Sequence, residues 1–351
     1  MKKSRKKKLQ AFLLTFCMAV SALPWGVETE QTIYAGEGDL GDSSGLLESV
    51  NLEGVVYKEI EPGKMQLVEW GQEIAWNATV TIPETVTFDG NEYTVVSIGD
   101  RAFYDKQTMA GVIFPDTILS IGESAFDNCT RLGRLELPPD LKEIGRSAFY
   151  RCYALSGELV IPVSVTSIGM SAFSYCTKLE SVKILNPDIS YGGYEFSQDS
   201  SLVHITLPEG MTSLGSSEQG NMLYDCKKLV QIDLPESLTE IPKGTLYGCA
   251  ALTEIHIPTS VKKIGSSAFM ACTGLREISI PEGVTEILSQ TFCNCSEELC
   301  VIFPDSITSV HNWTFWNNSA GQNKYSTTVT AKCTSREVAV LVAGIGHKKY
   351  C

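Results

Sequence analysis

Short alternating runs of apolar residues recur along the chain at a nearly constant interval. In one such unit, Leu132, Leu135 and Leu137 are followed directly by Pro138. The alternation predicts a short strand with one buried side, and proline, which has no N–H group, ends such a strand. The unit usually continues with an apolar residue before glycine and then with an Ala-Phe pair, which other units match more loosely. We expect a tight corner there, followed by a short turn whose phenylalanine fills the interior.

The phenylalanine of this pair defines a column that extends through most of the chain. Successive members are 23, 23, 24, 23, 27, 23, 23, 23 and 23 residues apart. The column is Phe103, Phe126, Phe149, Phe173, Phe196, Leu223, Leu246, Phe269, Phe292 and Phe315. One unit of this length cannot bury its apolar side alone, so neighbouring units must stack. The sequence therefore predicts a repeat solenoid, mainly β, forming a rod of about ten coils with short strands and turns.

A cysteine lies three residues after the phenylalanine column in seven of the units. These residues are Cys129, Cys152, Cys176, Cys226, Cys249, Cys272 and Cys295, and Lys106, Asp199 and Asn318 take the position elsewhere. Spacings near 23 match no zinc-binding pattern. We interpret the column as structural, with buried thiols that meet backbone groups of the turns and do not form disulfides with one another.

Four other cysteines, Cys293, Cys300, Cys333 and Cys351, fall outside this column. They could form disulfides, and the sequence leaves their pairing open.

The shared pattern Leu-x-x-Ile-x-Ile-Pro, Ile-Gly, Ala-Phe-x-x-Cys resembles the BspA-like, or Treponema-type, leucine-rich repeat of bacterial surface proteins. The resemblance covers about residues 93–320. Proline after the strand and cysteine late in the unit distinguish this type from the ordinary leucine-rich repeat. The resemblance implies a leucine-rich-repeat rod and a role as an extracellular adhesin or host-interaction protein.

The two ends of the array depart from the repeat, as expected of caps that cover exposed apolar edges. We predict an N-terminal β cap at 50–96, with a hairpin at Asp89-Gly90-Asn91 and a strand-like run at 78–83. The repeats then extend over 97–320. A C-terminal cap at 321–351 would contain a strand near 327–331 and a short helix at 338–346, since Thr334 and Glu337 have capping-box spacing.

The first 35 residues have the pattern of a secretory signal peptide. A cluster of six basic residues precedes the apolar run from Ala11 to Leu23, which is too short to remain as a membrane anchor. Cleavage is expected after Ala35, with Ala22 as an alternative, and residues 36–49 would form a flexible leader. The sequence thus predicts a secreted or cell-surface protein with no membrane insertion after cleavage.

The net charge of the chain narrows the classes of partner that it can bind. The full chain has a net charge of −13, and loss of residues 1–35 removes six basic and two acidic side chains, which leaves −17. Such a surface disfavours nucleic acid, because phosphate backbones require clustered basic residues.

Catalytic and metal-binding patterns do not emerge from the sequence. No HExxH motif, glycine-rich phosphate loop or Ser-His-Asp order is found. His204 and His256 fall two coils apart, too far to share a metal ion. We therefore expect a protein that is not an enzyme and that needs no cofactor or metal.

Two surfaces are candidates for partner binding. The first is the outward side of the strands, where two mainly acidic columns contain Glu136, Glu158, His204, Asp233, Glu254, His256 and Glu277. Solenoids bind partners along such sheet surfaces, although a merely solvated surface would look the same. Aromatic platforms, which would favour glycan binding, do not occur in these columns.

The second candidate is the insertion in the single 27-residue unit. Its residues are Ser216, Ser217, Glu218, Gln219 and Asn221, with Gly220 expected to give a flexible, outward-bulging tip. A harmless bulge is the alternative. The sequence favours a non-catalytic, adhesin-like module that binds a host extracellular or bacterial envelope protein; the alternative is a structural spacer or glycan-binding component of the bacterial cell envelope.

Overall fold

The computed structural model describes residues 39–40, 46–296, 298–311, 313–317, 324–325 and 330–333. The predicted signal peptide and the terminal helix expected at 338–346 lie outside the described residues. All described residues belong to one compact unit, Ile33–Cys351. Within them the chain forms strands and turns and no helix, and coils of about 23 residues stack as a β solenoid. The predicted fold class is confirmed, and the ten positions of the phenylalanine column span about nine turns.

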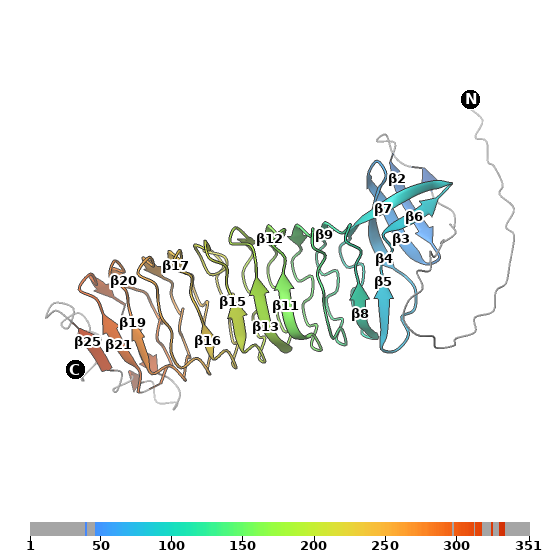
Figure 1. The fold of residues 1–351 in the computed structure, drawn as a ribbon. Helices are drawn as coiled ribbons and strands as arrows, with labels where there is room; N and C mark the ends of the chain where they lie inside the picture. The colour runs from blue at the N-terminus through green and yellow to red at the C-terminus, as the bar shows by residue number, and fades with distance from the viewer. Residues whose placement is uncertain are drawn as a thin grey trace, which may run out of the picture. The chain divides into compact units, whose positions relative to one another are not determined.

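The first strands of successive coils pair in parallel and form one side of the solenoid, here called the long-strand face (Figure 1). Equivalent positions are in register, so Ser181 pairs with His204 and His204 with Gln231. The strands are β5 (Ala78–Thr81), β8 (Met109–Ile113), β11 (Ser156–Ile161), β13 (Lys178–Ile184), β15 (His204–Thr206), β16 (Gln231–Ile232), β19 (Glu277–Ser279), β21 (Cys300–Phe303) and β25 (Thr330–Cys333). Strand pairing stops between β8 and β11 and again between β16 and β19.

Two-residue strands form a second side, the short-strand face. They are β9 (Ser120–Ile121), β10 (Glu143–Ile144), β12 (Ser167–Ile168), β14 (Ser190–Tyr191), β17 (Glu240–Ile241), β18 (Lys263–Ile264), β20 (Glu286–Ile287) and β22 (Ser309–Val310). A glycine commonly follows, because neighbouring coils approach too closely for a side chain. A Cβ on Gly145 would lie 2.5 Å from the carbonyl carbon of Gly122 in the preceding coil.

The third side, here called the turn edge, carries the phenylalanine column. The rings lie buried and nearly parallel, with centroids 4.9 Å apart for Phe103 and Phe126 and 5.1 Å apart for Phe126 and Phe149. The backbone two residues before and two residues after the first nine column positions is left-handed, with φ of 52° at Ser124 and 62° at Asn128. The N–H groups of Phe126 and Asn128 donate to carbonyls of the next coil at 2.7 and 2.8 Å. These inter-coil bonds hold the edge in one conformation.

An antiparallel sheet precedes the first coils. It contains β1 (Asp39–Leu40), β2 (Leu47–Leu52), β3 (Val55–Glu61) and β4 (Lys64–Trp70), and β4 pairs in parallel with β7 (Asn91–Ile98). β6 (Thr85–Phe88) and β7 form the expected hairpin, whose turn residues Asp89 and Gly90 have φ of 49° and 78°. The 78–83 run does not join this sheet. β5 pairs in parallel with β8 and so begins the long-strand face.

The last described elements are three short strands. β23 (Trp316–Asn317) pairs antiparallel with β24 (Lys324–Tyr325). β25 pairs in parallel with β21, close to the strand expected near 327–331.

Candidate functional site

The long-strand face presents the two predicted columns to solvent. Glu136, Glu158, His204, Asp233, Glu254, His256 and Glu277 are all exposed. Parallel pairing aligns Glu158, Ser181, His204 and Gln231 across four successive strands. Strand alternation places the intervening side chains, such as Val182, in the core.

These acidic residues do not converge on one point. Arg134 forms an ion pair with Glu136 at 2.9 Å, and Gln231 donates a hydrogen bond to Asp233 at 2.8 Å. Within the described residues, no group of three or more His, Cys, Asp or Glu side chains could hold a metal ion. The geometry therefore offers spaced polar contacts along a sheet.

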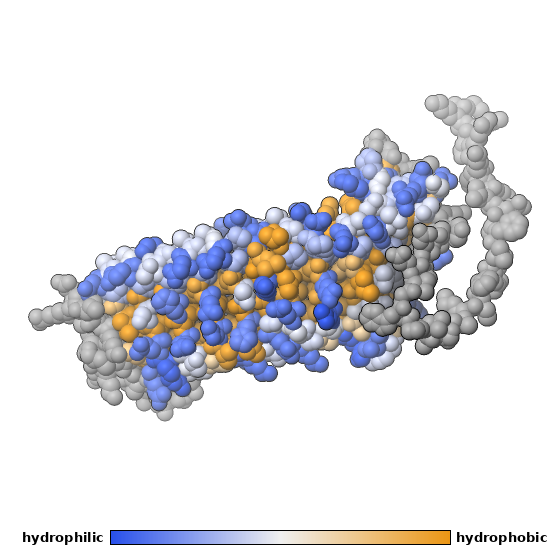
Figure 2. All heavy atoms as spheres, viewed as in Figure 1, coloured by the Kyte–Doolittle hydropathy of each residue, from blue (hydrophilic) through white to orange (hydrophobic). Residues whose placement is uncertain are grey.

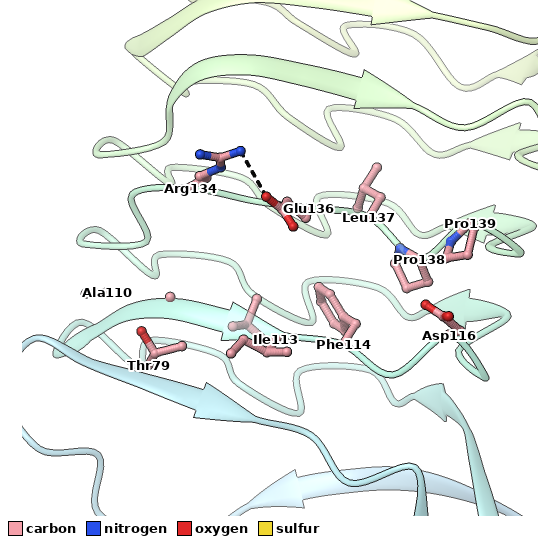
Figure 3. A pocket seen from close by; sticks show the side chains of 12 residues that line it. Thr79, Ala110, Ile113, Phe114, Asp116, Arg134, Glu136, Leu137, Pro138 and Pro139 are labelled. Atoms are coloured by element: carbon pink, nitrogen blue, oxygen red, sulfur yellow. Dashed lines mark ion pairs between the residues drawn. The ribbon is translucent and has the colours of Figure 1, made fainter. Parts of the chain in front are cut away.

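A groove of about 530 Å³ opens on this face where strand pairing stops after β8 (Figure 3). Ile113 and Phe114 line it from one coil and Leu137 from the next, and the Arg134–Glu136 ion pair lies at its rim. Only the bridge between Gly111 and Arg134 joins these two coils as strands there. The groove is thus lined by a mixture of apolar side chains and polar groups, among them Asp116, Arg134 and Glu136.

Exposed apolar residues occur in this groove and on the coils that follow it. Ile113 is 55% exposed and Val163 is 66% exposed, and Val160 and Leu185 on the following coils are also exposed. Figure 2 shows apolar surface along the coils in this part of the solenoid. The alternation of the sequence places Ile113 and Val160 in an outward column of the strands. It does not predict that exposed apolar residues occur together in this part of the solenoid. The feature of the sequence that could have indicated the groove is the pair of glycines Gly111 and Gly133, because two residues without side chains leave this part of the face little covered.

The insertion lies on a different side of the coil. It follows Gly215, at the corner between the short-strand face and the turn edge, and Ser217 donates a hydrogen bond to Glu240 of β17. Its exposed residues are Ser217, Glu218 and Gln219, and Ser216 is half-buried. The structure therefore does not bring the two predicted surfaces together.

Two expectations for the insertion are corrected. Gly220 is buried and is not a flexible tip: its N–H donates to the Ser216 carbonyl at 2.8 Å, and a Cβ there would collide with the Lys243 carbonyl. Asn221 is 6% exposed, and its N–H donates to the same Lys243 carbonyl at 2.8 Å. It anchors the loop to the next coil and is not available to a partner.

The seven column cysteines lie buried, and within the described residues none forms a disulfide. Each thiol donates to the carbonyl of the phenylalanine-column residue one coil earlier, as Cys129 does to Phe103 at 3.1 Å and Cys272 to Leu246 at 3.1 Å. Burial raises the pKa of Cys129 and of Cys295 to about 12. Thiols in this state are poor nucleophiles.

Cys293 is buried as well, and burial raises its pKa to about 11. The side chain of Cys333 and all of Cys351 lie outside the described residues.

Two buried carboxylates, those of Glu195 and Asp199, lie in the coil of Phe196, which precedes the insertion. Glu195 accepts a hydrogen bond from the N–H of Gly193, and Asp199, in the cysteine column, accepts one from the N–H of Cys176 at 2.7 Å. The second oxygen of each carboxylate has no hydrogen-bond partner among the described residues. Burial raises the pKa of Glu195 to about 7 and that of Asp199 well above its ordinary value. Sequence reasoning had found Asp199 in the column but not its burial.

The repeats of this chain match a known family of proteins. The family model of the BspA type leucine rich repeat region, in six copies, matches residues 96–222 and 219–321, more than half of the chain. The comparison with curated proteins gave no match. In the described residues, the structure contains no helix long and apolar enough to cross a membrane.

Several solved structures are similar to this chain. A leucine rich cell surface protein from Faecalibacterium prausnitzii A2-165 is 24% identical, with a TM-score of 0.50, over 84% of this chain and 97% of that one. A leucine-rich repeat protein from Bacteroides ovatus ATCC 8483 is 23% identical, with a TM-score of 0.47, over 86% and 99%. The T. pallidum leucine rich repeat protein is 27% identical, with a TM-score of 0.45, over 64% and 88%. On the match of the repeats themselves, the chain belongs to the family of proteins with a BspA type leucine rich repeat region.

Proposed function

We propose that the chain is a non-catalytic, adhesin-like module that binds a protein partner through the long-strand face. The observation that carries this proposal is the groove beside Ile113, with exposed apolar residues in it and on the coils that follow it and the Arg134–Glu136 ion pair at its rim. Contiguous exposed apolar surface with a polar rim is characteristic of protein interaction sites. Backbone hydrogen bonds between the neighbouring coils, such as the bond from the Gly133 N–H to the Ala110 carbonyl at 2.9 Å, would limit the entropic cost of presenting the groove.

The predicted signal peptide and the cell-surface relative support a secreted or cell-surface location. A host extracellular or bacterial envelope protein is therefore the proposed partner. The acidic columns beside the groove favour a partner surface that is basic or polar.

Capture of proteins from host extracellular and bacterial envelope fractions tests this proposal. Wild-type protein should retain a specific protein saturably, and the double variant Ile113→Lys with Val160→Lys should lose it, because lysine disrupts apolar contact at both positions. Leu119→Lys is the matched control, since Leu119 is exposed to 38% against 37% for Val160 and precedes β9 of the short-strand face. Equal capture by all three proteins, or saturable binding to polysaccharide alone, would contradict the proposal.

A further inference from the structure

The turn edge carries a row of tyrosines that was not predicted from the sequence. Five successive coils contribute one ring each: Tyr150, Tyr175, Tyr194, Tyr224 and Tyr247. Their offsets from the phenylalanine column differ, since Tyr194 precedes it and the others follow it, so the row is hidden in the sequence. We name this set the tyrosine row.

Ring contacts link the members of the row. The centroids of Tyr150 and Tyr175 are 5.4 Å apart, those of Tyr194 and Tyr224 are 6.3 Å apart, and those of Tyr224 and Tyr247 are 4.5 Å apart. Tyr175 is 37% exposed and the other rings are half-buried. The row therefore consists of two linked groups along the solenoid, the pair Tyr150 and Tyr175 and the set of three Tyr194, Tyr224 and Tyr247.

The backbone beneath the row is fixed before any ligand arrives. Tyr175 and Tyr194 are both left-handed, with φ of 64° and 60°. Their N–H groups donate to the carbonyls of Ser197 and Gly220 at 2.9 and 3.1 Å. Because the inter-coil bonds hold these residues, little conformational freedom would be lost on binding.

Charges beside the row are paired. The Arg151 guanidinium lies 4.9 Å from the Tyr150 ring centroid and forms an ion pair with Asp127 at 3.0 Å. Lys227 forms an ion pair with Asp225 at 3.1 Å. These charges balance locally while the whole chain is strongly acidic, so the row suits a neutral ligand better than a polyanion.

The inserted loop borders the row at its midpoint. The Gly220 carbonyl accepts the Tyr194 N–H, and Ser217, Glu218 and Gln219 of the loop are exposed. The loop thus carries exposed hydroxyl, carboxylate and amide groups within three residues of the Gly220 contact with Tyr194. This combination complements a sugar chain, whose C–H faces pack against rings and whose hydroxyls bond to polar side chains.

We propose that the tyrosine row, together with the inserted loop, binds a neutral polysaccharide. The coils repeat about every 4.8 Å along the solenoid. A row with one tyrosine ring per coil therefore suits a polymer with one small sugar ring per repeat. This site lies on a different side of the coil from the groove at Ile113, and the inference goes beyond the proposed protein-binding function.

Affinity electrophoresis of the full chain tests the proposal, with soluble mannan, dextran, galactomannan and mixed-linkage β-glucan as neutral probes and dextran sulfate as the charged probe. At least one neutral polysaccharide should retard the wild-type protein. Tyr175→Ala and Tyr224→Ala should each weaken the affinity about tenfold, which corresponds to loss of one aromatic contact. Tyr175→Phe should retain most of the binding because it keeps the ring.

Trp76→Ala is the control for non-specific aromatic contact. Trp76 is 71% exposed and has the Arg131 guanidinium 4.1 Å from its ring centroid, but it lies before β5, outside the five coils that carry the tyrosine row. Its loss should leave retardation unchanged, as should Ile113→Lys in the long-strand face. The proposal is overturned if no neutral polysaccharide retards the wild type, if only dextran sulfate does, or if the tyrosine variants bind as the wild type does.

Discussion

At the scale of single residues, the interior of this solenoid tolerates polar groups only where the backbone supplies partners. The column thiols show the regular solution, because each donates to a carbonyl of the preceding coil. Glu195 and Asp199 depart from it, since each has one oxygen without a hydrogen-bond partner among the described residues. Such groups link stability to pH.

Glu195 makes stability greater in mild acid than in mild base. Burial raises its pKa to about 7 in the folded chain, above the ordinary value that applies after unfolding, so the folded state holds the proton more tightly. The stabilisation is full below the ordinary pKa and disappears as the pH rises through about 7. Between pH 5.5 and 8 the loss should be about 2 kcal/mol.

Urea unfolding of wild type and Glu195→Gln at both pH values measures this effect. The difference between the two pH values should shrink by about 2 kcal/mol in the variant, because glutamine does not titrate. The same pH dependence in both proteins would show that Glu195 is not the responsible group.

Cys272→Ser should lower the free energy of unfolding by about 1–3 kcal/mol, because it places a more polar group in the interior. The shorter C–O bond also places the hydroxyl farther from the Leu246 carbonyl, which the thiol reaches at 3.1 Å. Chemical denaturation measures the change, with the exposed neighbour substitution Thr273→Ser as control. Equal stability of Cys272→Ser and wild type would mean that the column is not buried as described.

At the scale of elements, the insertion is an addition to a coil that is otherwise intact. Removal of residues 216–219 places Gly220 and Asn221 directly after Gly215, which restores the ordinary 23-residue spacing. Asn221 would keep its bond to the Lys243 carbonyl of the next coil, and the Gly220 carbonyl its bond from the Tyr194 N–H, while the bond from Gly220 to Ser216 is lost. Surface loops of this kind contribute little to stability.

The deletion should therefore shift the thermal midpoint only slightly, whereas Gly220→Ala should destabilise the chain by several kcal/mol. Alanine at that position would combine a left-handed φ of 59° with a collision against the Lys243 carbonyl. Differential scanning calorimetry of both variants gives the comparison. A deletion more damaging than Gly220→Ala would show that the loop itself is structural.

The strands and turns were predictable because their residues repeat. Proline after the strand, glycine at the corner and phenylalanine in the turn each have one physical role that recurs in most coils. The burial of Gly220 was not predictable, since it depends on the position of the Lys243 carbonyl one coil away. Likewise, the tyrosine row requires knowledge of how offset columns meet on the turn edge.

At the scale of the whole molecule, one array of coils presents different chemistry on its different sides. The long-strand face combines spaced acidic residues with the groove at Ile113, and the turn edge combines tyrosines with paired charges. The sequence identified the first side as a candidate from its outward columns. It did not locate the groove, because that opening arises where two coils stop pairing as strands between β8 and β11.

Hydrogen–deuterium exchange of the chain with and without its captured protein partner tests the central claim most directly. Binding at the groove should slow exchange in peptides that cover 109–116, 132–139 and 156–163. Peptides from the turn edge and from the insertion at 216–221 should exchange as they do in the free protein. Protection confined to the turn edge or to the insertion, with exchange at 109–116 unchanged, would contradict a protein-binding role for the long-strand face.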